Sequence, residues 1–215
     1  MRKNNFLFVA LLAFIGLIAL SGCAKREIVN IGSKGSEIIC FGDSITWGYG
    51  ASEGEDYTAA LAKLTSFKVI NSGIDGDTST EALKRLHSDI LDRDPLLVII
   101  EFEGNDFLRK IPQETTVNNI RQMVDSVQAK GAMVAIVDIS AGMFLKEYRK
   151  VFEKLALEKG TIFIPGILNG IITNPSMKSD FIHPNANGYI MIAQQIYRAI
   201  LPHLTENSQL RETGK

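Results

Sequence analysis

Length, composition and charge restrict this chain to few classes of protein. Its 215 residues, 46% of them hydrophobic and 22% charged, suit a single globular domain with a sizeable core and exclude a long disordered region. The net charge is −1, and the sequence has no cluster of basic residues of the kind that follows a phosphate backbone, which excludes nucleic acid as a partner.

The first 22 residues have the build of a secretory signal peptide. Arg2 and Lys3 precede an apolar run over residues 6–20, and small residues follow this run before Cys23. The alternative is an uncleaved membrane anchor, but the run has about 15 residues, whereas a membrane-spanning helix needs about 20. We therefore expect cleavage.

The residues Leu20-Ser21-Gly22-Cys23 resemble the lipobox of bacterial lipoproteins, in which the cysteine is lipidated and becomes the first residue of the mature chain. The resemblance implies an extracytoplasmic protein that several acyl chains on Cys23 hold on a bacterial membrane, since one chain alone binds only marginally. Cys40 is then the one cysteine left, so no intrachain disulfide can form. Its place inside an apolar run predicts a buried and inert side chain.

The rest of the chain divides into three parts. Residues 23–36 are polar and punctuated by Gly and Ser, which predicts a tether. We expect the folded domain over residues 37–204 and a polar, frayed tail over 205–215.

Within the domain, short apolar runs alternate with longer amphipathic ones. The short runs predict strands over 38–41, 68–71, 96–102, 133–139 and 162–165. The long runs predict helices over 80–91, 117–130, 145–159 and 186–201, with Gly131 and Gly160 as stops.

Strands without apolar–polar alternation are buried on both faces, and strand–helix alternation implies parallel pairing. The pattern therefore predicts an α/β fold, a flavodoxin-like three-layer α/β/α sandwich around a parallel five-stranded sheet.

Ser44 lies in the stretch Gly-Asp-Ser-Ile-Thr over 42–46, directly after the first expected strand. It is either a nucleophile at a strand end or only a turn former, and the stretch alone does not decide between them. The segments 71–79 and 103–106 follow the second and third strands. Ligands of such sheets bind beyond the carboxyl ends of the strands, so we expect these three segments to meet at one edge.

A serine hydroxyl needs a base to become a nucleophile. Of the three histidines, His87 lies in an expected helix and His203 near the chain end, whereas His183 lies in a loop three residues after Asp180. A carboxylate at this spacing can reach the imidazole and fix its tautomer, although a capping or turn role is the alternative.

Acyl transfer also needs donors aimed at the developing oxyanion. Gly73 and Asn105 are candidates, the first through its backbone N–H and the second through its amide, with a turn and a helix cap as the alternatives. A calcium loop at Asp75 and Asp77 would lack its remaining oxygen ligands.

Four segments in this order, 42–46 (GDSIT), 72–79 (SGIDGDTS), 104–106 (GND) and 180–184 (DFIHP), resemble the SGNH/GDSL hydrolase family. The resemblance covers residues 37–204 and is strongest to bacterial acyl-CoA thioesterase I/lysophospholipase enzymes. It implies Ser44 as nucleophile, His183 as general base, and Asp180 as the residue that orients this base. It also implies an oxyanion hole made by the Ser44 and Gly73 amides and the Asn105 side chain, with neither metal nor cofactor.

The chain departs from that subgroup at three positions. Glu103 stands where glycine is usual and could change the rim of the site or its charge. Phe107 and Phe181 stand where small residues are usual, and we expect them to crowd the acyl pocket. Trp47 and Tyr49 either line that pocket or pack into the core.

These features predict a serine esterase that hydrolyses ester or thioester bonds of small acyl substrates through an acyl-enzyme. Two alternatives stay open. The same triad could remove acetyl groups from carbohydrates of the cell envelope, because fold and triad do not select the acyl acceptor. The chain could also be a lipoprotein that binds lipid or glycan without turnover, although such a module does not need the whole set of catalytic residues.

Overall fold

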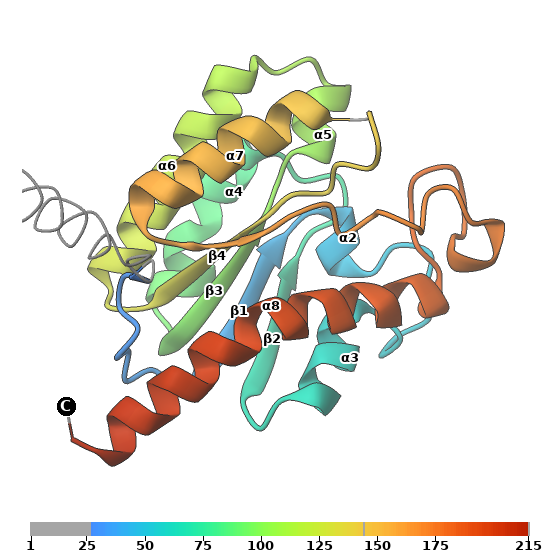
Figure 1. Cartoon of the computed structure of the whole chain (residues 1–215). Coiled ribbons are helices and arrows are strands. Elements are labelled where there is room, and N and C mark those ends of the chain that lie inside the picture. Colours follow the sequence, from blue (N-terminus) through green and yellow to red (C-terminus); the bar gives the residue numbers. More distant parts are fainter. Residues whose placement is uncertain (1–26, 144, 215) are drawn as a thin grey trace, which may run out of the picture.

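A parallel five-stranded sheet forms the centre of the computed structural model, which describes residues 27–143 and 145–214 (Figure 1). The strands are β1 (Glu37–Gly42), β2 (Lys68–Gly73), β3 (Pro95–Glu101), β4 (Met133–Val137) and β5 (Ile162–Ile164). Their order is β2-β1-β3-β4-β5, and every neighbouring pair is parallel. This order is that of flavodoxin-like sheets and confirms the predicted fold class.

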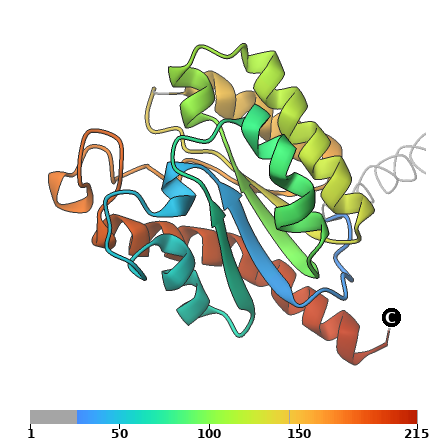
Figure 2. The ribbon, with the colours of Figure 1, turned by 180° about the vertical axis from the view of Figure 1, so that it is seen from behind.

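Helices cover both faces of the sheet. On one face α3 (Tyr57–Leu64) packs against α8 (Ala186–Glu212), and the other face carries α4 (Ser79–Leu86), α6 (Gln113–Ala129) and α7 (Lys146–Lys159) (Figures 1 and 2). The short elements are α2 (Ser44–Trp47), α5 (Gly104–Leu108), the π-helical turn η1 (His87–Leu91) and the 3-10 turn η2 (Pro175–Met177). The single helix expected over 80–91 is therefore α4 followed by η1.

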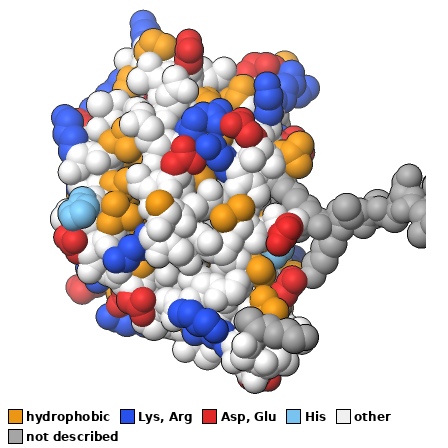
Figure 3. Space-filling view, turned by 90° about the vertical axis from the view of Figure 1, so that its left-hand side faces the viewer, with side chains coloured by type: hydrophobic (Ala, Val, Ile, Leu, Met, Phe, Trp, Pro, Cys, Tyr) orange, Lys and Arg blue, Asp and Glu red, His pale blue; other side chains and the backbone are white. Residues whose placement is uncertain are grey.

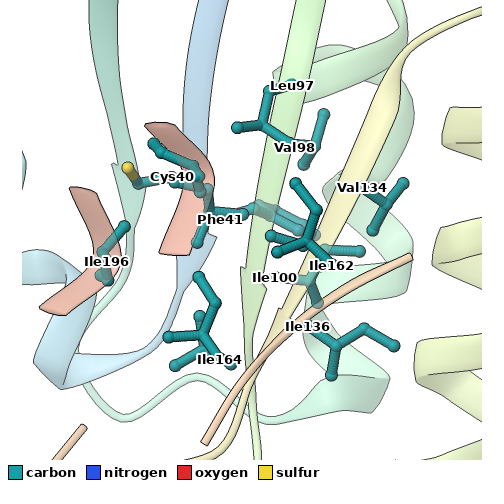
Figure 4. Packing of buried hydrophobic residues seen from close by; sticks show 14 of the residues in the cluster. Cys40, Phe41, Leu97, Val98, Ile100, Val134, Ile136, Ile162, Ile164 and Ile196 are labelled. Carbon is teal, nitrogen blue, oxygen red and sulfur yellow. The ribbon is translucent and has the colours of Figure 1, made fainter. Parts of the chain in front are cut away.

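The core lies between these layers. All seven residues of β3 are buried, as expected for a strand that has helices on both sides. The strand register brings Phe41, Ile100 and Ile136 side by side in the sheet. They belong to the same buried cluster as Ile164 of β5 and Ile196 of α8 (Figure 4). Cys40 is fully buried, and burial raises the pKa of its thiol to about 12. The thiol therefore stays protonated, as the prediction of an inert side chain requires.

The expectation of a frayed tail is wrong for residues 205–212, which continue α8. Asn207 is fully buried, and its Nδ2 donates hydrogen bonds to the carbonyls of Ile31 and Ser33 at 2.7 and 2.9 Å. The Arg211 guanidinium donates to the carbonyls of Ser33 and Gly35. These bonds satisfy loop carbonyls and hold the last helical turns against the domain.

The expectation that the fold begins at residue 37 is also wrong. Ile28 is buried in the core, and the Val29 amide donates to the Gly160 carbonyl at 2.9 Å. The Asn30 side chain donates to the carbonyls of Gln128 and Ala132. Residues 27–36 thus cross the amino ends of β5 and β4 before they enter β1. The predicted signal peptide, Cys23 and the start of the tether lie outside the described residues.

Candidate active site

Ser44 lies just beyond the carboxyl end of β1, where Asp43 follows the strand and caps α2. The Asp43 side chain accepts a hydrogen bond from the Ile45 amide at 3.1 Å, which caps the four-residue helix. Ser44 is the first helical residue, and 8% of its surface is exposed. A tight, capped strand-to-helix turn therefore holds the hydroxyl at the edge of the sheet.

The loop before α8 places His183 against this hydroxyl. His183 Nε2 lies 3.1 Å from Ser44 Oγ, and His183 Nδ1 lies 2.8 Å from Asp180 Oδ2. The second carboxylate oxygen of Asp180 accepts hydrogen bonds from the amides of Ile182 and His183, both at 2.8 Å. The structure thus brings together the serine, histidine and aspartate that the sequence pattern singled out.

Asp180 is ionised at neutral pH. Partial burial acts to raise its pKa, but the hydrogen bonds from the His183 ring and from the two amides outweigh burial and hold the pKa at about 2. A carboxylate that stays negative can fix the protonated nitrogen of the imidazole on its own side and stabilise an imidazolium.

Tyr49 supports the imidazole from another direction. The rings of Tyr49 and His183 lie with their centroids 4.4 Å apart and their planes inclined by 40°. The Tyr49 carbonyl in turn accepts a hydrogen bond from the Tyr189 hydroxyl at 2.7 Å, which ties this loop to α8. From the sequence alone Tyr49 was a lining or core residue, because nothing in the sequence paired it with a residue 134 positions away.

Asn105 lies across the cavity mouth on α5. Its Nδ2 donates to Asp43 Oδ2 at 3.1 Å, which leaves the second hydrogen of the amide for another acceptor. Asp43 is 2% exposed, and burial raises its pKa to about 6, against the effect of the Ile45 amide and other donors. At pH 7 and above Asp43 is therefore mainly a carboxylate that orients the Asn105 amide.

The structure does not bring the Gly73 amide to this site. The Gly73 N–H donates to Asn71 Oδ1 at 2.9 Å, and a Cβ at Gly73 would lie 2.2 Å from the Trp47 nitrogen. Gly73 therefore allows β2 to pack against α2, and the expected oxyanion role of its N–H is not met. The loop that follows β2 reaches the cavity at Asp75, and the next residue, Gly76, has a φ of +77°.

A cavity of about 260 Å³ opens beside Ser44. The aliphatic side chains in its lining are Ile45, Leu108, Ile139, Leu168, Ile172 and Ile182. Leu168 and Ile172 come from the irregular segment between β5 and α8, which has no periodic pattern from which their position could be predicted. The polar residues of the lining are Asp43, Ser44, Asp75, Asn105 and His183, so the cavity is apolar except at the reacting end.

Phe107 and Phe181 do not line this cavity, contrary to expectation. Phe181 is 89% exposed and Phe107 is 46% exposed. On α5 it is Leu108, three residues after Asn105, that shares the face toward the cavity. In the histidine loop the cavity is lined by Ile182 and not by Phe181.

Glu103 does not alter the rim or its charge, because its side chain is fully buried. Its Oε1 accepts a hydrogen bond from the Ile139 amide at 3.2 Å, which links the segments that directly follow β3 and β4. Burial and then the neighbouring Asp138 raise the pKa of Glu103 well above its usual range, which favours the protonated carboxyl. Among the described residues no group of His, Cys, Asp and Glu is arranged to hold a metal ion.

Most of the chain is similar to known enzymes. The family model of the GDSL-like lipase/acylhydrolase family matches residues 40–190. Esterase TesA of Pseudomonas aeruginosa is 26% identical over 87% of this chain and 98% of its own length. Thioesterase 1/protease 1/lysophospholipase L1 of Escherichia coli is 28% identical over 80% of this chain and 86% of its own.

A solved structure shares the fold. It is that of a psychrotrophic esterase, EstA of Pseudoalteromonas, inhibited by monoethylphosphonate, and it superposes with a TM-score of 0.72 at 25% identity over 79% of this chain and 99% of EstA. The chain thus belongs to the GDSL-like lipase/acylhydrolase family, as the sequence pattern predicted, and is a serine hydrolase that acts on ester bonds.

Proposed function

We propose that the chain hydrolyses acyl esters or thioesters through an acyl-enzyme on Ser44. The observation that carries this proposal is the chain of contacts from Ser44 Oγ through the His183 ring to the Asp180 carboxylate, at 3.1 and 2.8 Å. A nucleophile, a base and a group that orients the base at these distances form the arrangement that acyl transfer requires.

The reaction proceeds in two halves. His183 Nε2 accepts the proton of Ser44 as Oγ forms a bond to the carbonyl carbon, and the same proton then passes to the alcohol or thiol that leaves. In the second half a water molecule gives a proton to His183 and attacks the acyl-enzyme, and the proton returns to Oγ as the acid departs. Asp180 stays ionised throughout and stabilises the imidazolium.

Two donors for the oxyanion are the Ser44 amide and the second N–H of Asn105. For a third donor we propose the Gly76 N–H in place of that of Gly73. Gly76 follows Asp75 of the cavity lining, and its N–H takes part in no hydrogen bond identified within the described residues. The Gly76 carbonyl accepts a hydrogen bond from Arg109 at 2.6 Å, which fixes the loop.

The apolar walls of the cavity favour an acyl chain of several carbons. Each methylene that enters such a cavity gains about 0.8 kcal/mol, whereas an acetyl group would leave most of the walls without contact. The cavity therefore favours acyl esters, including lysophospholipids, over the deacetylation of envelope carbohydrates. A binding protein without turnover would have no use for the imidazole next to Ser44.

The substitution Ser44→Ala tests the proposal. Turnover of p-nitrophenyl butyrate should fall by about four to six orders of magnitude, because removal of the nucleophile leaves only binding and oxyanion stabilisation. A fluorophosphonate probe should label the wild type at Ser44 alone. Ordinary turnover by Ser44→Ala, or labelling at another residue, would refute the assignment.

We also propose that Cys23 is lipidated and holds the mature chain on a bacterial membrane. The support is the lipobox-like sequence after an apolar run. No helix in the part of the chain that the structure describes is long and apolar enough to span a bilayer. The full-length protein should partition into detergent, and Cys23→Ser should abolish both lipid labelling and processing at that residue. A wild type that is not lipid-labelled, or whose mature chain starts at another residue, contradicts this assignment without affecting the esterase.

A further inference from the structure

Exposed apolar side chains gather at the edge of the sheet where the cavity opens. Of the thirteen large hydrophobic side chains that are exposed in the described residues, eight lie in segments that follow the carboxyl ends of strands. These eight, here called the rim, are Trp47, Tyr49, Ile74, Phe107, Leu108, Met143, Phe181 and Ile182. Each of the five strands leads to at least one of them.

The segments that carry much of the rim lie on one side of the molecule. Figure 1 shows α2, α5, the loop after β4 and the segment between β5 and α8 together on the right. The opposite side, on the left in Figure 1 and in front in Figure 3, has only small apolar patches between charged and other side chains. The exposed apolar surface is thus concentrated around the active site.

The rim is continuous with the cavity. Leu108 and Ile182 belong to both, since each lines the cavity and is also exposed to solvent. An acyl chain could therefore pass from an apolar surface over Leu108 or Ile182 to Ser44 without crossing water. This continuity favours an acyl-lipid surface as the occupant of the rim over a second protein, which would close the mouth of the cavity.

The chemistry of the rim also suits a lipid surface. Phe181 and Met143 are 89% and 91% exposed, on loops, and touch little of their own domain. Trp47 and Tyr49 are aromatic and carry one polar group each, as do side chains that settle at the boundary between lipid and water. Exposed apolar groups so concentrated in a soluble domain indicate an interaction surface.

We propose that the rim docks on the surface of a phospholipid bilayer and admits acyl chains from it to Ser44. The delivery of acyl chains to Ser44 rests on the proposed function. The binding of the rim to a bilayer does not require turnover. Phe107 and Phe181 then act on the lipid surface and not on the interior of the pocket.

Trp47 reports directly on the rim because it is the only tryptophan of the chain. The experiment uses residues 24–215, which lack the expected signal peptide and Cys23. Nearly the whole of EstA, 99% of its chain, corresponds to only 79% of this chain, so a domain of this fold does not need the first 23 residues. Vesicles of phosphatidylcholine added to this chain with Ser44→Ala should shift the Trp47 emission to shorter wavelength. Brominated phosphatidylcholine should quench it. Emission that vesicles leave unchanged would overturn the proposal.

Variants locate the surface that binds. The double substitution Met143→Ser and Phe181→Ser should lower the vesicle partition coefficient about tenfold or more. Leu157→Ser, on α7 and 66% exposed, is the matched control and should leave it unchanged. An equal loss of vesicle partitioning in the rim variant and in Leu157→Ser would mean nonspecific adsorption. A shift of the Trp47 emission with protein concentration alone, without vesicles, would mean that a second copy covers the rim. Either result overturns the proposal.

Activity on a soluble substrate separates docking from catalysis. In chains that retain Ser44, the rim variants should hydrolyse p-nitrophenyl acetate at the wild-type rate, which also shows that they are folded. They should lose activity on lysophosphatidylcholine carried in vesicles. If the wild type hydrolyses neither substrate while Trp47 still responds to vesicles, the esterase assignment fails and the docking surface stands.

Discussion

The ring of Tyr49 lies against the imidazole of His183, with 4.4 Å between the ring centroids. This contact limits the motion of the base and places an electron-rich ring beside an imidazole that becomes positive during the reaction. Tyr49→Ala should therefore lower kcat by about two- to tenfold, the range that corresponds to one aromatic contact of about 0.5–1.5 kcal/mol. Tyr49→Phe, which keeps the ring, should retain nearly full kcat. A similar loss in both variants would mean that the hydroxyl and not the ring matters.

The hydrogen bond from Asn105 to Asp43 should couple these residues in catalysis. Asn105→Ala should lower kcat by about 10² to 10³, because one oriented donor to the oxyanion is lost, with a much smaller change in substrate binding. Asp43→Asn should cause a smaller loss by releasing the Asn105 amide. The double variant should be no worse than Asn105→Ala, since both act through the same donor. Additive losses in kcat would contradict this coupling, and a raised KM with unchanged kcat would make Asn105 a binding residue.

The acyl chain length that the enzyme prefers should depend on the residues that line the cavity and not on Phe181. Ile172→Ala removes carbon atoms from the lining, so the ester with the highest kcat/KM should become longer. Phe181→Ser is the matched control and should leave the chain-length optimum for soluble esters unchanged. A series of p-nitrophenyl esters from acetyl to decanoyl measures both. A shift in the Phe181→Ser optimum would place that ring in the acyl path after all.

Glu103 should make the stability of the fold depend on pH. Burial raises the pKa of this carboxyl in the folded chain above its unfolded value near 4.3, so folding takes up a proton at higher pH. The free energy of unfolding should therefore fall as the pH rises above about 4.3, by up to about 1.4 kcal/mol per unit for this group. It should go on falling until the pH exceeds the folded pKa.

Glu103→Gln removes the ionisation and keeps an oxygen for the Ile139 amide. Urea unfolding between pH 5 and 8 should show a flatter dependence for this variant and higher stability than the wild type at pH 8. Glu153→Gln, at an exposed position on α7, is the control and should follow the wild-type curve. Parallel curves for wild type and Glu103→Gln would show that Glu103 is already ionised in the fold.

Periodicity was enough to predict the sheet, because buried strands such as β3 are apolar on both faces and the helices between them have one apolar face. It failed at the two ends of the domain for a physical reason. Many of the contacts that hold residues 27–36 and 205–212 are hydrogen bonds from the side chains of Asn30, Asn207 and Arg211 to backbone carbonyls, and such bonds have no sequence period.

The residues of the site could be predicted where a side chain performs the chemistry, as for Ser44, His183 and Asn105. They could not be predicted where the position of a residue depends on how the loops pack. Gly73 ends β2 and Gly76 lies in the loop that follows, only three residues later, and nothing in the sequence shows that the Gly73 N–H is taken up by the Asn71 side chain. The same holds for Phe107 and Leu108, adjacent residues of α5 of which only Leu108 lines the cavity.

Residues 27–36 cross the amino ends of the strands, and this path decides which way a tethered enzyme can face. Glu27 is four residues from Cys23, a stretch that spans at most about 14 Å. β1 alone is about 20 Å long, and the mouth of the cavity lies beyond its far end. A lipid on Cys23 would therefore hold the domain with its catalytic mouth pointing away from the supporting bilayer. The enzyme would then take its esters from a facing surface or from the space between, and would spare the lipids of the membrane that carries it.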